Sequence, residues 1–124
     1  MLIYKTIFLT CITGNVYDYM TRSSQVKITV LKVFSPSEVF QESPVIHEEP
    51  FGKCPFFKKG DEFTIDNYPF GMPEGFCPAA WQSIYHSIRT LAFGGNFPWL
   101  KEKGVGVACC IDGLRPVVFK FERV

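Results

Sequence analysis

Cysteines are the residues of this chain best suited to chemistry. The sequence contains an odd number of them, without a close C-x-x-C pair: Cys11, Cys54, Cys77, Cys109 and Cys110. Cysteine thiolates bind zinc and iron–sulfur clusters, and they act as nucleophiles. No convincing secretory signal precedes them, which favours free or metal-bound thiols over a disulfide framework. We therefore expect a reducing, cytoplasmic location.

A metal site is the sharpest interpretation of these cysteines. Zinc or an iron–sulfur cluster takes three or four thiolates, and the candidates are Cys54, Cys77, Cys109 and Cys110. The spacing is not that of a standard site, because Cys54 and Cys77 are far apart without a knuckle between them. Adjacent residues of a regular strand also point to opposite sides, so only one of the Cys109–Cys110 pair could join the other two. Simple packing of buried cysteines is the alternative.

Cys77 is also a candidate catalytic residue. It precedes Pro78, which suits the first position of a helix, so Cys77 is the predicted N-cap. The positive end of a helix stabilises a thiolate, although nearby Glu74 opposes this effect. A nucleophile needs a base, and His86 is predicted to face solvent. Arg115 could hold an anion or activate a thiol, but a surface arginine is the simpler interpretation.

One helix is clearly predicted, over residues 78–93. Pro78 opens it, and Gly94-Gly95 followed by Pro98 close it. Its apolar residues recur at i, i+3 and i+4 spacing and predict one buried face. That face contains Trp81, Ile84, Tyr85, Ile88, Leu91 and Ala92.

Strands are predicted over 26–34, 62–65, 105–111 and 115–123. The first alternates apolar and polar residues and is rich in β-branched side chains. The last two form a hairpin around Asp112-Gly113, a dipeptide typical of a two-residue turn. This pairing places Cys110 opposite Arg115, Ala108 opposite Val117 and Gly106 opposite Phe119. These residues and Phe121 share one face of the hairpin, where the small residues of one strand leave room for the large residues of the other. The predicted fold is a small α+β domain, an antiparallel sheet with one helix on a face.

Residues 25–124 are predicted to form this single domain, and residues 1–24 to be an atypical N-terminal extension. Between the first two strands, the proline-rich residues 37–55 indicate a long ordered loop. After the helix, an aromatic connection contains Trp99, which either seals the core edge or binds a ligand. These loops leave a third class open, a plain protein-interaction module.

Composition excludes several functions. Apolar residues make up 47% of the chain, and thirteen basic residues oppose twelve acidic ones, so no global field attracts nucleic acid or acidic membrane. Lys58, Lys59, Lys101 and Lys103 are too few to change this and indicate a solvated surface. No phosphate loop, dinucleotide fingerprint or nucleophile elbow is present. The partners expected are a small molecule or metal, with a homo-oligomer left open.

Several motifs occur in a characteristic order: VKITVLKVF, Cys54-Pro55, MPEGFC, LAFGGNFPW and VACCIDGLRPVVFKFERV. Over residues 25–124 the chain thereby resembles a family of small bacterial and archaeal cysteine-containing proteins. The resemblance implies the domain but no established activity, and it implies cysteines at the positions of Cys54, Cys77, Cys109 and Cys110. We therefore predict a small binding domain with a cysteine-centred site. A thiol-based redox or nucleophilic enzyme using Cys77 is the alternative.

Overall fold

A four-stranded antiparallel sheet forms the framework of the protein. The computed structural model describes residues 22–124, in which the strands are β1 (Val26–Val33), β2 (Glu62–Ile65), β3 (Val105–Cys109) and β4 (Val117–Arg123). Their order in the sheet is β2-β1-β4-β3, so β1 and β4, the first and last of the described strands, are central. The predicted α+β fold is confirmed, while most of the predicted extension, residues 1–21, lies outside the described residues.

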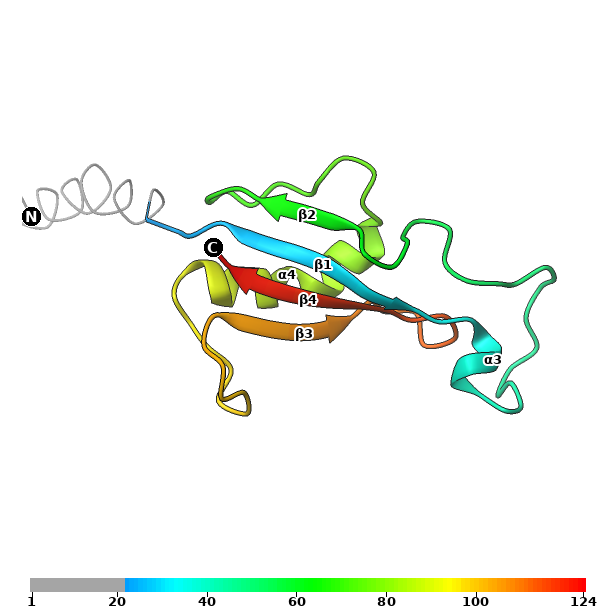
Figure 1. Ribbon diagram of the computed structural model, residues 1–124. Helices are drawn as coiled ribbons and strands as arrows, with labels where there is room; N and C mark the ends of the chain where they lie inside the picture. Colours follow the sequence, from blue (N-terminus) through cyan, green and yellow to red (C-terminus); the bar gives the residue numbers. More distant parts are fainter. Residues whose placement is uncertain (1–21) are drawn as a thin grey trace, which may run out of the picture.

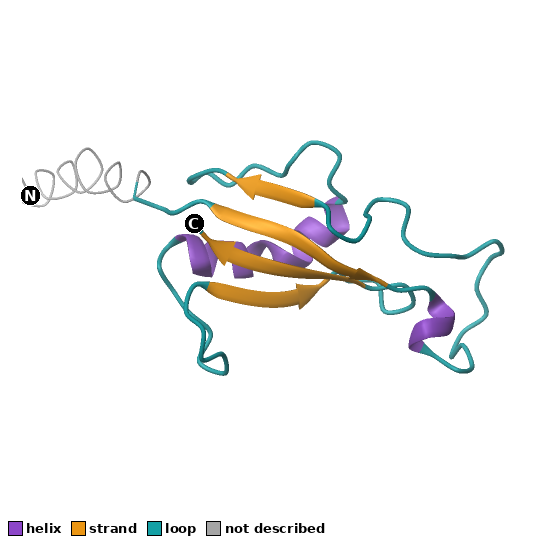
Figure 2. Ribbon diagram, viewed as in Figure 1, coloured by secondary structure: helices purple, strands orange, loops and turns teal. Residues whose placement is uncertain are grey.

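The helix α4 (Pro78–Ala92) covers one face of this sheet (Figure 1). Within residues 22–124 no helix lies over the opposite face, as the view in Figure 2 shows. A short helix, α3 (Pro36–Val39), projects beyond the end of β1, where the sequence predicted only the start of a loop. Ser35 and Glu38 form a capping box there, which explains why this single turn is helical.

The ends of α4 follow local rules. Cys77 is the N-cap and Pro78 the first helical residue, as predicted. At the other end Gly94 has a φ of 87°, and its N–H and that of Gly95 donate to the carbonyls of Leu91 and Thr90. This pair of bonds is the Schellman motif, which needs a residue in the left-handed region.

The buried face of α4 is rotated relative to the predicted one. The residues buried along it are Ala80, Ile84, Ser87, Ile88, Leu91 and Ala92. Ser87, which was predicted to lie outside the face, is buried, whereas Trp81 is only half-buried and His86 is exposed as expected. Small Ala80 and Ser87 let the helix backbone approach the sheet, so Trp81 lies on the flank against Phe76, with ring centroids 5.9 Å apart.

The register of the β3–β4 hairpin differs from the prediction by two residues. Ala108 pairs with Phe119 and Gly106 with Phe121. The last hydrogen-bonded pair is Cys110 with Val117, so residues 111–116 form a six-residue loop instead of a two-residue turn. Pro116 has no N–H to donate to the ladder, which explains why β4 begins only at Val117. A shift of two residues keeps every side chain on its predicted face, but it takes Arg115 out of the sheet.

Candidate functional site: a pocket lined by three cysteines

Three cysteines from separate segments line one cavity of about 160 Å³. Cys54 belongs to the loop between α3 and β2, Cys77 caps α4, and Cys110 follows β3. All three are half-buried and free of disulfide bonds. The rest of the lining is mainly apolar and consists of Phe56, Phe57, Ala79, Ala80, Ile111 and Val117, together with Asp112 and Arg115.

Phe57 attaches the Cys54 loop to the core. It is 4% exposed, and its ring lies edge-on to those of Phe76 and Phe119, at centroid distances of 4.8 and 5.2 Å. Phe76 immediately precedes Cys77, while Phe119 lies on the central strand β4. A single aromatic cluster therefore positions both the Cys54 loop and the start of α4 over the end of the sheet.

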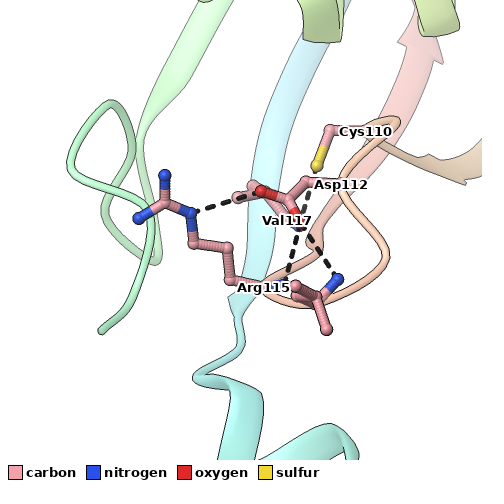
Figure 3. A network of polar contacts seen from close by, with 5 residues as sticks. Cys110, Asp112, Arg115 and Val117 are labelled. Carbon is pink, nitrogen blue, oxygen red and sulfur yellow. Dashed lines mark hydrogen bonds and ion pairs between the residues drawn. The ribbon is translucent and has the colours of Figure 1, made fainter. Parts of the chain in front are cut away.

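The third cysteine is positioned by the end of the hairpin. The Cys110 N–H donates to the Val117 carbonyl at 3.0 Å, and the Val117 N–H donates to Cys110 Sγ at 3.3 Å. Figure 3 shows this contact beside the loop of residues 111–116. The sulfur is thus held on the helix-covered side of the sheet, which is the side expected from the alternation of the strand.

Asp112 organises the loop at the rim of the pocket. Its Oδ1 accepts hydrogen bonds from the Leu114 and Arg115 N–H groups at 2.9 and 3.2 Å. Its Oδ2 accepts one from Arg115 Nε at 3.2 Å (Figure 3). Burial by itself raises the pKa of the Asp112 carboxyl, but these hydrogen bonds and the charge of Arg115 outweigh it, so the net shift is downward.

Arg115 brings a positive charge to the same rim. Its guanidinium lies 4.3 Å from the centre of the Phe51 ring, which comes from the Cys54 loop. Within residues 22–124 only Nε of the guanidinium forms a hydrogen bond, and the two terminal nitrogens point away from Asp112 (Figure 3). The predicted pairing of Arg115 with Cys110 across a ladder is wrong, because Cys110 lies opposite Val117. Both residues nevertheless line the pocket.

The other predicted site residues lie elsewhere. Cys109 is exposed and does not line the pocket, as expected for the neighbour of Cys110 on a strand. Trp99 is 75% exposed, and its ring lies tilted against that of Phe97, with centroids 5.3 Å apart, in the connection after α4. Neither histidine lines the pocket, so the described residues place no imidazole base beside the thiols.

Asp112 is a pocket residue whose role in the loop sequence reasoning missed. The Asp-Gly dipeptide was interpreted as a tight turn, whereas the carboxylate binds backbone N–H groups two and three residues further on. Aspartate commonly forms such turns, and Pro116 was the signal that the loop had to be longer.

Comparisons with known proteins assign the chain to no family. No family model, curated protein or solved structure matches the chain. Among the described residues, no helix is long and apolar enough to cross a membrane.

Proposed function

We propose that this domain binds a soft metal ion, with zinc as the reference case, through Cys54, Cys77 and Cys110. The observation that carries the proposal is the convergence of three free cysteines, from three segments far apart in the sequence, on one small cavity. Cysteines that only filled core space would have no reason to share one cavity. Thiolate sulfur is the preferred ligand of such ions.

The surroundings of the thiols suit a single ion better than a cluster. Iron–sulfur clusters usually take four cysteines, whereas three thiolates leave a zinc ion with one open position. Three thiolates and one divalent zinc ion carry a net charge of −1. Arg115 and Asp112 also line the pocket, but they form an ion pair with each other and leave this net charge unchanged. The apolar walls restrict water and strengthen the attraction between the thiolates and the ion.

Binding requires the thiols to move. Within residues 22–124 no group of three or more His, Cys, Asp or Glu side chains is arranged to hold a metal ion. Zinc–sulfur distances are about 2.3 Å, so the three side chains have to turn inward and the cavity has to contract. Metal binding is therefore expected to order the Cys54 loop and to raise thermal stability, since the ion binds the folded chain.

Cadmium titration of the reduced protein tests this proposal. Cadmium is a spectroscopic probe for zinc–thiolate sites, and we expect one ion per chain with a thiolate-to-metal charge-transfer band. A Cys11→Ser background removes the cysteine that lies outside the described residues. In that background Cys54→Ser, Cys77→Ser and Cys110→Ser should each weaken binding at least tenfold. Cys109→Ser is the matched control and should bind like the parent.

Two outcomes would contradict the metal site. One is the absence of a stoichiometric charge-transfer band in fully reduced protein. The other is an equal loss of binding in Cys109→Ser, because that thiol is exposed and does not line the pocket. Elemental analysis of protein purified without oxygen or chelator identifies the ion that is bound in the cell.

A thiol nucleophile is the second candidate, and one observation favours it. Cys77 is the N-cap of α4, yet its side chain makes no capping hydrogen bond, so its sulfur is not engaged by the helix. Asp112 is the one carboxylate in the pocket lining, and it is already bound by Arg115 and two amides. Activation of Cys77 would therefore depend on the helix N-terminus rather than on a general base.

A further inference from the structure

A second cavity shares Phe57 with the cysteine pocket in its lining. Its volume is about 500 Å³, within the range of cavities that hold small ligands. Its lining is Lys32, Val33, Glu38, Lys53, Phe57, Lys58 and Lys59. We call it the lysine cleft.

The charge of the lysine cleft differs sharply from that of the whole chain. Four lysines and one glutamate line it, which gives a local charge of +3, whereas the formal charge of all 124 residues is +1. Glu38 lies 3.7 Å from Lys53, and the pKa of its carboxyl is lowered, chiefly by the hydrogen bond from the Ser35 N–H. It is therefore ionised at neutral pH, and three positive charges remain uncompensated within the lining.

The fold fixes the backbone from which these lysines extend. Lys32 is in β1, directly after a bulge in its ladder with β4. The turn that carries Lys58 is closed by the Asp61 carboxylate, which accepts the Lys58 N–H at 2.8 Å. The Gly60 N–H then donates to the Val30 carbonyl at 2.8 Å and attaches that turn to β1. Like charges repel one another, so a bound anion would offset the repulsion among the lysines held on this backbone.

We propose that the lysine cleft binds a small polyanion, a molecule bearing a di- or triphosphate group. Ammonium groups bind phosphate oxygens as point charges, and an oligophosphate can reach lysines from β1, the Cys54 loop and the turn before β2 together. The cleft is a bounded concavity, not a stripe along the surface, so it suits a compact ligand better than a nucleic acid strand.

The test is a titration with inorganic tripolyphosphate at fixed ionic strength. Binding is measured by calorimetry or by NMR of the backbone amides. One site per chain is expected, with shifts concentrated at residues 32, 53, 58 and 59. Lys53→Gln and Lys58→Gln should each weaken binding about two- to fivefold, as for an exposed charge pair. Glu38→Gln should strengthen binding by a similar factor, because it removes the one opposing charge and keeps an oxygen that accepts the Ser35 N–H.

The matched control is the double variant Lys101→Gln/Lys103→Gln, which removes two exposed lysines outside the cleft. If it weakens binding as much as Lys53→Gln/Lys58→Gln, attraction depends on total charge alone and the proposal is overturned. Tighter binding of a short single-stranded oligonucleotide than of tripolyphosphate, again lost with Lys53 and Lys58, would also overturn it in favour of an extended ligand. All the substituted lysines are exposed, so the variants are expected to fold. The test does not involve the cysteines, so its result is separate from that of the metal titration.

Discussion

Among single residues, Asp112 connects the shape of the hairpin loop with the charge of the cysteine pocket. Its two carboxylate oxygens bind the backbone of residues 114 and 115 and the guanidinium of Arg115. The same guanidinium rests on Phe51, so it joins the hairpin loop to the Cys54 loop. Removing the charge of Asp112 should therefore affect both the stability of the loop and the position of Arg115.

Asp112→Asn gives a pH-dependent prediction. Because folding lowers the pKa of this carboxyl below its ordinary value of 3.8, its ionised form stabilises the native state above about pH 4. That contribution is lost as the pH falls through the lower, folded-state pKa. At pH 7 the variant should be about 0.5–1 kcal/mol less stable, a modest figure because the side chain is 39% exposed. Denaturant unfolding from pH 7 to 3 should show the two proteins converging in acid, and a constant difference would contradict the assignment.

Cys77 gives a second prediction at this scale. If Cys77 is a nucleophile, its place at the N-terminus of α4 should make it react with an alkylating agent faster than the other cysteines. Exposed Cys109 is the internal control, since accessibility alone would make it react first. Cys110, half-buried beside Val117, should react slowly. Mass spectrometry after a timed iodoacetamide pulse reads each site, and faster labelling of Cys109 would exclude an activated Cys77.

Among the secondary-structure elements, α4 shows how small residues set the packing of a helix. Ile84 and Ile88 are fully buried, while Trp81 lies at the flank between the rings of Phe76 and Tyr85. Hydrophobic spacing alone predicted that Trp81 is buried. The buried face instead includes the small residues Ala80 and Ser87, and Trp81 is only half-buried.

Substitutions in α4 test this arrangement. Ile84→Ala should cost about 3 kcal/mol, because it removes a fully buried side chain and leaves a cavity. Trp81→Ala should cost about 2 kcal/mol, less than a fully buried tryptophan, because the side chain is partly solvated already. Exposed Gln82→Ala should change stability by less than about 0.5 kcal/mol. Thermal and denaturant unfolding measure all three, and a larger loss for Trp81→Ala than for Ile84→Ala would contradict the observed helix rotation.

The edge strand β3 has one position where only glycine fits. A Cβ at Gly106 would lie 2.7 Å from Phe97 Cε2 and 3.2 Å from Phe97 Cδ2, so Gly106→Ala should cost about 1–3 kcal/mol through overpacking. Phe97→Leu should restore part of this loss when combined with it. Gly113→Ala is the control, because nothing lies within 4 Å of the Cβ position there. Equal effects at the two glycines would contradict the close contact between β3 and the aromatic connection.

Across the whole molecule, Arg123 joins the last strand to the end of the helix. One guanidinium nitrogen donates to the carbonyls of Leu91 and Gly95, at 3.1 and 2.6 Å, and the other donates to Asn96 Oδ1 at 3.0 Å. Asn96 Oδ1 also accepts the Gly104 N–H before β3. One side chain thus satisfies carbonyls at the C-terminus of α4, where a positive charge is favourable.

Arg123→Lys tests this connection. A lysine keeps the charge but cannot reach three acceptors in a fixed fork, so the variant should lose about 1.5–3 kcal/mol of stability. Lys120→Gln on the same strand loses only a surface ion pair with Glu122 and should change stability by less than about 1 kcal/mol. Hydrogen exchange should also show faster opening of residues 91–96 in Arg123→Lys. Unchanged exchange there would mean that the helix end does not depend on β4.

Local chemistry in the sequence was sufficient to predict the four strands and α4, but not the single-turn helix α3. Pro78 and Gly94 mark the ends of α4 through the missing N–H of one and the left-handed φ of the other, and alternation assigned the buried side of β4 and of the first half of β1. Such signals depend on a few neighbouring residues, so they can be recognised without a fold. They also predicted that only one member of the Cys109–Cys110 pair could face Cys54 and Cys77, because a strand turns adjacent side chains to opposite sides, and of the pair only Cys110 lines the pocket.

Only the tertiary structure decided how these parts meet. The hairpin register depended on Asp112 and Pro116 enlarging the loop, and the helix rotation depended on which small residues touched the sheet. The meeting of Cys54 with Cys77 and Cys110 depended on Phe57 packing against Phe76 and Phe119, from three segments distant in sequence. Hydrophobic periodicity shows which residues of one segment share a face. It does not show which distant segment packs against that face, because that contact forms only when the chain folds.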